Sequence, residues 1–295
     1  MLDRRQGLKG ALALAGLATA GGRAMAAASI SAAGPSVVAL FEQRNRFMVE
    51  VAINGAGGYR FVLDTGASTH FISARLVEQL RLPEVDRRMT KGYNGRDRES
   101  VVGLASLTVG GVALGRTNAD VWPSERLEDH DGLIGYPFLF PRAVLSLGSG
   151  EVSLGGRAAD AMVPVAARVM RDQTLLIGGV GGVEGRFLFD TGAQNCTITP
   201  GYLRRIAGTD AFQAAAKFGR RNADGQTEIA GFRPEELAFG AFRIASPNIR
   251  VAPAEDSGSV FDDVDGLFGV SLIKPYAWAL DQTARSLRAG PAAPA

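Results

Sequence analysis

The segment FVLDTGASTHFIS (61–73) recurs later in the chain as FLFDTGAQNCTIT (187–199), and this repeat decides the fold. In each copy an apolar run leads into Asp-Thr-Gly-Ala and an apolar segment leads out. The two aspartates, Asp64 and Asp190, lie 126 residues apart. A repeat of this length is too long for a solenoid unit, so it predicts duplication of a whole domain with pseudo-twofold symmetry.

The sequence before each Asp-Thr-Gly-Ala segment repeats as well. VEVAINGAGGYRFVLD (49–64) corresponds to LLIGGVGGVEGRFLFD (175–190). Both have the order strand, Gly-rich turn, strand, which predicts a β-hairpin. A phosphate-binding loop at 178–185 is disfavoured, because the Gly-Lys-Ser/Thr ending is missing and the glycines lead into a strand instead of a helix.

A short helix is predicted after each segment. Ser73 is placed to cap a helix over 74–80, and Thr199 to cap a helix with Pro200 at its first position. Further on, DGLIGYPFLF (131–140) matches DGLFGVSLIK (265–274) at similar distances from the two aspartates.

The repeat and its flanks define the predicted domain organisation. Each half ends in an apolar segment that predicts one closing strand, 144–155 in the first half and 277–290 in the second. We therefore expect a mostly β fold of two homologous lobes, 34–156 and 157–290, with short helices. The last residues, 291–295, are expected to be a disordered tail.

The composition fits a globular β protein. The chain has 295 residues, of which 46% are hydrophobic and 21% are charged, and it contains 38 glycines. Its net charge is +2, but residues 1–28 contribute +3 and the remainder carries −1. Without a basic excess in the remainder, we expect no nucleic-acid partner and no attraction to an anionic membrane.

Residues 1–28 are predicted to be an export signal. The basic start DRRQGLK (3–9) is followed by an apolar run over 10–20 and an Ala-rich stretch suited to cleavage after Ala26 or Ala28. The apolar run is too short to span a membrane. Arg4-Arg5 resembles a twin-arginine signal, with a general-secretion signal as the alternative. We expect a periplasmic or secreted protein without a membrane anchor after cleavage.

The scarcity of cysteine and histidine limits the possible chemistry. Cys196 is the one cysteine, so no intrachain disulfide can form, and His70 and His130 are the two histidines. We expect no metal and no cofactor. His70 and Cys196 each stand six residues after an aspartate of the repeat, which indicates equivalent structural positions.

Two aspartates brought together by a twofold axis predict a specific chemistry. Carboxylates about 3 Å apart cannot both ionise readily, so they share a proton, and the ionised partner can deprotonate a bound water. The alternatives are a scaffold that binds peptide without cleaving it, and a metal- or serine-based hydrolase, which the sequence supports weakly.

These motifs resemble those of the retroviral-type (retropepsin-like) aspartic proteases and their bacterial periplasmic relatives. The resemblance covers nearly all of the chain after the signal, and implies a bilobal retropepsin/pepsin-like acid protease barrel fold with a Ψ-shaped active loop in each lobe. It implies an aspartic endopeptidase that hydrolyses peptide or protein substrates through Asp64 and Asp190. The alternative is an inactive peptide-binding pseudoprotease of the same fold. Because one chain holds both aspartates, a monomer should suffice.

The resemblance also assigns the neighbours of the two aspartates. The residues implied to support the active loops are Thr65, Gly66, Ala67, Thr191, Gly192 and Ala193, with the glycines contacting substrate backbone. Ser68 and Gln194 stand where retroviral enzymes have an aspartate that binds substrate main chain, so they are substrate-binding candidates of a different chemistry.

The resemblance further implies a flap, a hairpin that covers the substrate. TKGYNGRDRES (90–100) is the first candidate, with Asn94-Gly95 as its turn signal. Tyr93 and Gly95 are its candidate substrate contacts. RRNADGQTE (220–228) is the matching segment of the second lobe. Two flaps, or one flap and one shortened arm, both remain open.

Overall fold

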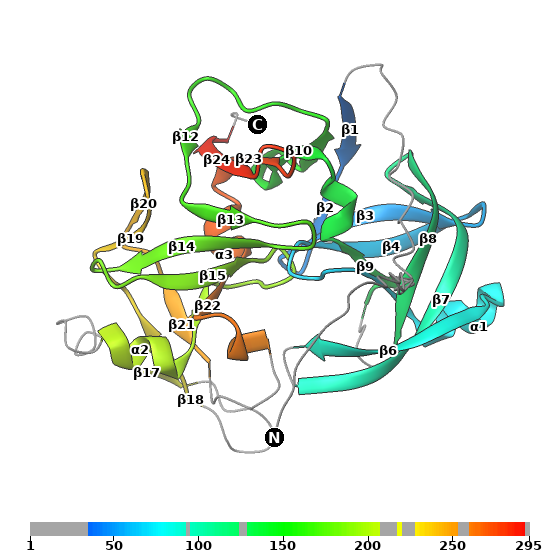
Figure 1. The fold of residues 1–295 in the computed structure, drawn as a ribbon, viewed down its shortest axis with the longest axis horizontal. Helices are drawn as coiled ribbons and strands as arrows, with labels where there is room; N and C mark the ends of the chain where they lie inside the picture. The colour runs from blue at the N-terminus through cyan, green and yellow to red at the C-terminus, as the bar shows by residue number, and fades with distance from the viewer. Residues whose placement is uncertain are drawn as a thin grey trace, which may run out of the picture.

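The computed structural model describes residues 35–92, 95–123, 129–206, 217–219, 228–252 and 260–292. It shows a mostly β protein with two lobes, as predicted (Figure 1). The predicted export signal, 1–28, lies outside the described residues. None of the helices in the described ranges has the length and apolar character needed to cross a membrane.

The first lobe is built on an eight-stranded sheet. In spatial order its strands are β2 (Phe41–Gln43), β3 (Arg46–Ile53), β4 (Ala56–Asp64), β9 (Gly132–Gly135), β5 (His70–Ser73), β8 (Val112–Trp122), β7 (Gly95–Val109) and β6 (Glu84–Gly92). The helix α1 (Ala74–Leu80) follows β5, and the 3-10 helix η2 (Tyr136–Leu139) follows β9. The sheet is strongly curled, since β3 also pairs with β7.

The second lobe repeats this plan. Its sheet has the order β17 (Lys217–Gly219), β18 (Glu228–Phe232), β21 (Ile249–Val251), β16 (Thr197–Ile198), β22 (Gly266–Phe268), β15 (Gly185–Phe189), β14 (Thr174–Val180), β19 (Glu236–Phe239) and β20 (Phe242–Ala245), with β13 (Ala167–Val169) paired to β14. Its helices are α2 (Pro200–Ile206), the 3-10 helix η5 (Val260–Asp262) and α3 (Val270–Ile273).

A third sheet joins the two halves of the chain. Its order is β1 (Ser36–Ala39), β11 (Glu151–Leu154), β10 (Arg142–Ser146), β23 (Tyr276–Asp281), β24 (Ser286–Pro291) and β12 (Val163–Pro164), with the 3-10 helix η3 (Leu147–Ser149) between β10 and β11. The central contact is the antiparallel pair β10–β23, in which Leu145 lies opposite Trp278. Strands from both halves therefore share one hydrogen-bonded sheet, visible at the top of Figure 1.

The local predictions around the repeat are confirmed. β3–β4 and β14–β15 are antiparallel hairpins. The Ser73 hydroxyl accepts a hydrogen bond from the backbone N–H of Leu76 at 3.2 Å, and the Thr199 hydroxyl accepts one from Tyr202 at 3.0 Å. Both helices therefore begin at the predicted caps.

The closing segments differ from the prediction of one strand each. Residues 144–155 form part of the hairpin β10–β11, and residues 277–290 lie within the hairpin β23–β24. The reversals come at Gly150, with φ of 69°, and at Arg285, with φ of 52°. The second hairpin runs on to Pro291, the first residue of the expected tail, and 293–295 lie outside the described residues.

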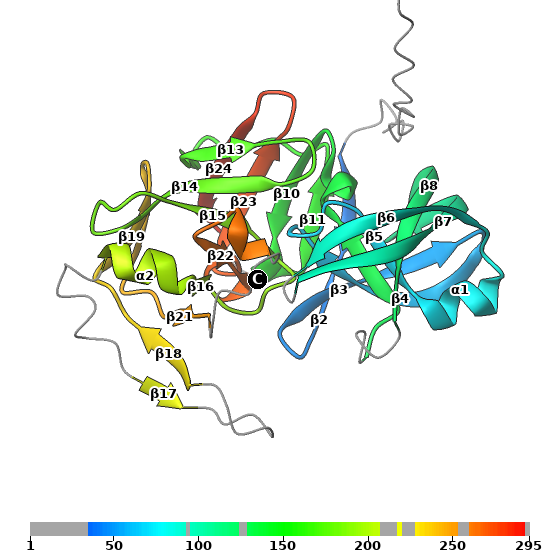
Figure 2. The ribbon, with the colours of Figure 1, turned by 60° about the horizontal axis from the view of Figure 1, so that its bottom comes forward.

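The two lobes differ in the strands that follow their first helix. In the first lobe β7 and β8 are long and continuous, with register shifts between Leu104 and Thr108. In the second lobe the corresponding run is divided into β18 and β19, with Arg233 and Pro234 in the interruption. Proline cannot donate to a ladder, so the division has a local cause. In both views the β6–β7 hairpin extends from its lobe toward the middle of the molecule (Figures 1 and 2).

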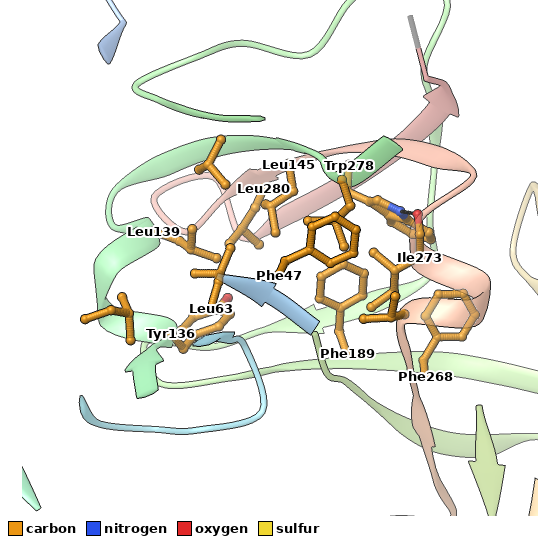
Figure 3. Packing of buried hydrophobic residues seen from close by; sticks show 14 of the residues in the cluster. Phe47, Leu63, Tyr136, Leu139, Leu145, Phe189, Phe268, Ile273, Trp278 and Leu280 are labelled. Atoms are coloured by element: carbon orange, nitrogen blue, oxygen red, sulfur yellow. Dashed lines mark hydrogen bonds between the residues drawn. The ribbon is translucent and has the colours of Figure 1, made fainter. Parts of the chain in front are cut away.

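One hydrophobic core supports both lobes. Leu63, directly before Asp64, and Phe189, directly before Asp190, belong to the same cluster of buried side chains (Figure 3). The Phe189 ring lies 5.0 Å from the Trp278 ring, centroid to centroid. The Trp278 indole is fully buried and donates a hydrogen bond to the carbonyl of Ile273 at 2.8 Å. The strands that deliver the two aspartates are therefore packed against common neighbours.

This packing predicts the effect of truncating Trp278. We expect Trp278→Ala to lower the free energy of unfolding by about 3–5 kcal/mol, because it leaves a cavity in the shared core and removes a buried donor. The measurement is urea unfolding followed by circular dichroism. Val37→Ala, at a position 59% exposed, is the control and should change stability by less than about 0.5 kcal/mol. Equal effects of the two substitutions would contradict this account of the core.

Candidate active site

The two Asp-Thr-Gly-Ala segments meet where the lobes join. Asp64 ends β4, and Asp190 directly follows β15. In the first lobe β9 lies between β4 and β5, parallel to β4 and antiparallel to β5. In the second lobe β22 lies between β15 and β16 in the same way. Each lobe therefore has the Ψ-shaped arrangement that the resemblance implied.

Thr65 and Thr191 form a reciprocal set of hydrogen bonds between the loops. The backbone N–H of each threonine donates to the hydroxyl of the other at 3.0 Å. The Thr65 hydroxyl donates to the carbonyl of Phe189 at 2.7 Å, and the Thr191 hydroxyl donates to the carbonyl of Leu63 at 2.6 Å. Both threonines are buried. These four bonds fix the positions of the two aspartates relative to each other.

Each aspartate is held by its own loop in the same way. Asp64 Oδ1 accepts hydrogen bonds from the backbone N–H groups of Gly66 at 2.9 Å and Ala67 at 3.1 Å. Asp190 Oδ1 accepts the equivalent bonds from Gly192 at 2.8 Å and Ala193 at 3.0 Å. The second oxygen of each carboxyl group is therefore held by neither of these amides. Ala67 and Ala193 serve the loops through their backbone.

The two carboxyl groups form one coupled pair. They hydrogen-bond to each other, and both are partly buried where the two loops meet. Burial raises the pKa of Asp64, partly offset by the hydrogen bond with Asp190. Burial also raises the pKa of Asp190 well above its ordinary value, and the negative charge of Asp64 raises it further. The pair therefore retains a shared proton at a pH where isolated aspartates would both be ionised.

Gly66 and Gly192 are required by the closeness of the two loops. A Cβ atom on Gly66 would lie 2.6 Å from Cγ of Asp190, and a Cβ atom on Gly192 would lie 2.4 Å from Cγ of Asp64. Each glycine thus lies against the carboxyl group of the opposite lobe. The expected contact of these glycines with substrate backbone stays a prediction.

The shared Asp-Gly-Leu-Ile/Phe-Gly motif packs beside the strand and loop that carry each aspartate of the pair. Asp131 Oδ2 accepts a hydrogen bond from the Arg60 backbone N–H at 2.9 Å, and Asp265 Oδ2 accepts one from the Arg186 backbone N–H at 2.8 Å. A Cβ atom on Gly135, the last glycine of the first motif, would lie 2.0 Å from the carbonyl oxygen of Thr69. The repeated aspartates of the motif therefore act structurally, a role that the repetition alone does not reveal.

His70 and Cys196 occupy equivalent positions, as predicted, and bind equivalent backbone groups. The N–H of Gly135 donates to Nδ1 of His70 at 3.1 Å. The N–H of Gly269 hydrogen-bonds to the thiol of Cys196. Both side chains are buried. Burial lowers the pKa of His70 to about 4 and raises the pKa of Cys196 to about 12. Each side chain therefore stays neutral and satisfies one buried amide.

The substrate-binding candidates have different environments. Ser68 and Gln194 are both exposed at equivalent positions of the two loops. Gln194 Nε2 donates to the carbonyl of Arg44 at 3.0 Å, so a turn of the first lobe contacts the active loop of the second.

In the first flap candidate, Gly95 begins β7 and lies opposite Gly92, which confirms a hairpin at this point. Tyr93 lies outside the described residues, as do 220–227 of the second flap candidate.

Within the described ranges, no group of three or more histidine, cysteine, aspartate or glutamate side chains is arranged to hold a metal ion.

A family model described as aspartyl protease matches residues 49–138 and 176–272, more than half of the chain. The chain therefore belongs to the aspartyl protease family of the retropepsin-like type, with one match in each repeat. A search of curated proteins gave no match.

The contact between the loops predicts the cost of a single methyl group. We expect Gly66→Ala to lower the free energy of unfolding by about 1–3 kcal/mol, because the methyl would overlap the Asp190 carboxyl, which its own loop holds in place. Gly57→Ala is the control, since a Cβ atom there would lie 3.5 Å from Ala52 Cβ. Urea unfolding of both variants is the measurement. If Gly66→Ala were as stable as Gly57→Ala, the loops would be farther apart than described.

The neutral state of His70 predicts a pH dependence of stability. Its folded pKa of about 4 lies below its ordinary value of 6.5. Between pH 4 and pH 6.5, His70 is therefore protonated in the unfolded chain but neutral in the folded chain. The contribution is fully present above pH 6.5 and is lost as the pH falls to 4, by an amount on the order of 3 kcal/mol.

His70→Asn should remove this loss, because an amide oxygen can accept from Gly135 without titrating. Unfolding free energies of both proteins between pH 4 and 7 are the measurement. His130→Asn is the comparison: burial lowers the pKa of His130 as well, but Asp129 and Asp131 act in the opposite direction, so we expect a smaller change than for His70→Asn. Parallel curves for wild type and His70→Asn would show that His70 takes up a proton in the folded protein.

Proposed function

We propose that this protein is an aspartic endopeptidase in which Asp64 and Asp190 act as one catalytic pair. The observation that carries the proposal is the symmetric pair of carboxyl groups, hydrogen-bonded to each other, with raised pKa values caused by burial. Such a pair carries one proton and one negative charge, which are the two states that general acid and general base catalysis need.

The pair allows a complete reaction without another catalytic side chain. The ionised carboxylate takes a proton from a water molecule, and the water oxygen forms a bond to the carbonyl carbon of the peptide. The protonated carboxyl group gives its proton to the carbonyl oxygen, so a neutral tetrahedral diol forms. Proton transfer to the amide nitrogen then breaks the C–N bond and releases an amine and a carboxylic acid. The pair returns to its singly protonated state.

The substrate class follows from the same chemistry. We propose that the substrates are peptides or unfolded protein segments, because an extended chain can lie across both lobes and present a backbone carbonyl to the two aspartates. Ser68 and Gln194, exposed beside the loops, are proposed substrate contacts. Because both aspartates come from one chain, we propose that the monomer is sufficient.

We also propose that the protein is exported to the periplasm or secreted. The support is the basic start, short apolar run and Ala-rich end of residues 1–28, with Arg4-Arg5 favouring the twin-arginine route. Export of a folded protein suits a chain with a single cysteine, which needs no disulfide to fold.

The test of the proposed activity is cleavage of a mixed peptide library from pH 3 to 8. We expect Asp64→Asn and Asp190→Asn each to lower kcat by a factor on the order of 10³, because each removes one partner of the shared proton. Asp160→Asn, on the exposed surface, is the control and should retain full activity. Circular dichroism verifies that all variants are folded.

Two outcomes would contradict the proposal. Full activity in either aspartate variant would exclude the pair as the catalytic group. A folded wild type that binds peptides and leaves them intact at every pH would favour an inactive peptide-binding protein of the same fold.

A further inference from the structure

Arg88 links the β6–β7 hairpin to the loop that carries Asp64. Its Nη2 donates to the hydroxyl of Thr69 at 2.8 Å, five residues after Asp64. The same guanidinium forms a two-pronged ion pair with Asp120 of β8, with Nε 3.0 Å from Oδ2 and Nη2 2.5 Å from Oδ1. One side chain of the hairpin stem thus contacts two neighbouring elements of the first lobe.

Asp120 gives this link its strength. It is fully buried in β8, opposite Phe71 of β5, the strand that leaves the active loop. A buried carboxylate is costly unless it is paired and hydrogen-bonded. The planar guanidinium matches the carboxylate with two parallel bonds, which fixes direction as well as distance. Arg88 therefore has one strongly preferred position over the active loop.

In the part of the second lobe that the structure describes, both residues that Arg88 contacts are replaced. Arg250 pairs with Thr197 in the same register in which Asp120 pairs with Phe71, so a cation replaces the buried carboxylate. Asn195 stands at the position of Thr69. The two lobes therefore differ at both positions that contact Arg88 in the first lobe.

We propose that Arg88 is a positioning residue that anchors the β6–β7 hairpin over the active loop and so prepares the site for substrate. The proposal rests on the proposed protease function. A fixed stem reduces the freedom that the hairpin must lose when substrate binds, and a hairpin that closes over substrate excludes water from the reaction. The anchor makes this hairpin the functional flap of the first lobe.

The experiment compares Arg88→Met with Arg87→Met in the purified full chain. The two arginines are neighbours on β6, but Arg87 bonds to the exposed Glu84, at 2.7 Å, instead of to the active loop. We expect Arg88→Met to raise KM on the order of 10-fold, with kcat and its pH profile largely unchanged, since charged hydrogen bonds are lost away from the reacting atoms. Arg87→Met should behave as wild type.

Two further variants distinguish positioning from general stability. A merely structural defect would lower the folded fraction, and hence the apparent kcat, without raising KM. Arg88→Lys keeps the positive charge but lacks the planar guanidinium, so its KM should lie between those of the wild type and Arg88→Met. Thr69→Val combined with Arg88→Met should be no worse than Arg88→Met alone, because both remove the same link. A KM unchanged by Arg88→Met in an active enzyme would overturn the proposal while leaving the protease function intact.

Hydrogen exchange tests the anchor without reference to cleavage. Amides of β6 should exchange faster in Arg88→Met than in wild type or Arg87→Met. Equal exchange in the three proteins would overturn the proposal. If the wild type cleaves no peptide, affinity for a statine-containing peptide, which mimics the tetrahedral intermediate, replaces KM. A 10-fold weaker affinity in Arg88→Met would then support the anchor although the proposed catalysis had failed, and an unchanged affinity would overturn it.

Discussion

The reciprocal hydrogen bonds between Thr65 and Thr191 are the constraint on which the site depends. Each threonine is buried, and its backbone N–H and hydroxyl find their partners in the other lobe. If the lobes separated, these four hydrogen bonds would break, and each buried group left without a partner would cost about 1–3 kcal/mol unless water reached it. Neither loop is therefore complete alone, and the distance between the aspartates is set by the bonds beneath them.

The shared core makes this constraint rigid. The carbonyls that accept from the threonine hydroxyls belong to Leu63 and Phe189, whose side chains are buried in one cluster with Trp278. A shift of either loop would have to move a carbonyl and a packed side chain together. Because close-packed interiors resist such movement, two carboxyl groups can be held in contact although they cannot both ionise readily there. The core packing and the threonine hydrogen bonds offset the unfavourable free energy of holding the two carboxyl groups together.

The sequence predicts the parts of this structure that are repeated. The two Asp-Thr-Gly-Ala segments, the hairpins before them and the caps at Ser73 and Thr199 all follow from local residue patterns, and the structure brings Asp64 and Asp190 together as their repetition indicated. The link from Arg88 to Thr69 and Asp120 joins residues up to 32 positions apart and occurs once among the described residues. Nothing in the local pattern distinguishes Arg88 from Arg87, so tertiary contacts are needed to find it. The closing hairpins were missed because their apolar residues continue on both sides of the turns.

His70 and Cys196 show what the duplication preserves. An imidazole and a thiol differ in size, polarity and chemistry, yet each accepts from the backbone N–H of the last glycine in the shared motif. The amides of Gly135 and Gly269 are buried at the ends of β9 and β22, so each needs a hydrogen-bond acceptor from the side chain beside it. The replacement of Asp120 by Arg250 is of a different kind, because it removes a carboxylate and places a cation at the same register. The groups that hold the aspartates therefore keep their function in both lobes, while the groups around the hairpins have diverged in charge. Symmetry is required at the pair of carboxyl groups, and asymmetry arises beside the hairpins, where the proposed peptide substrate, with its two different ends, would lie.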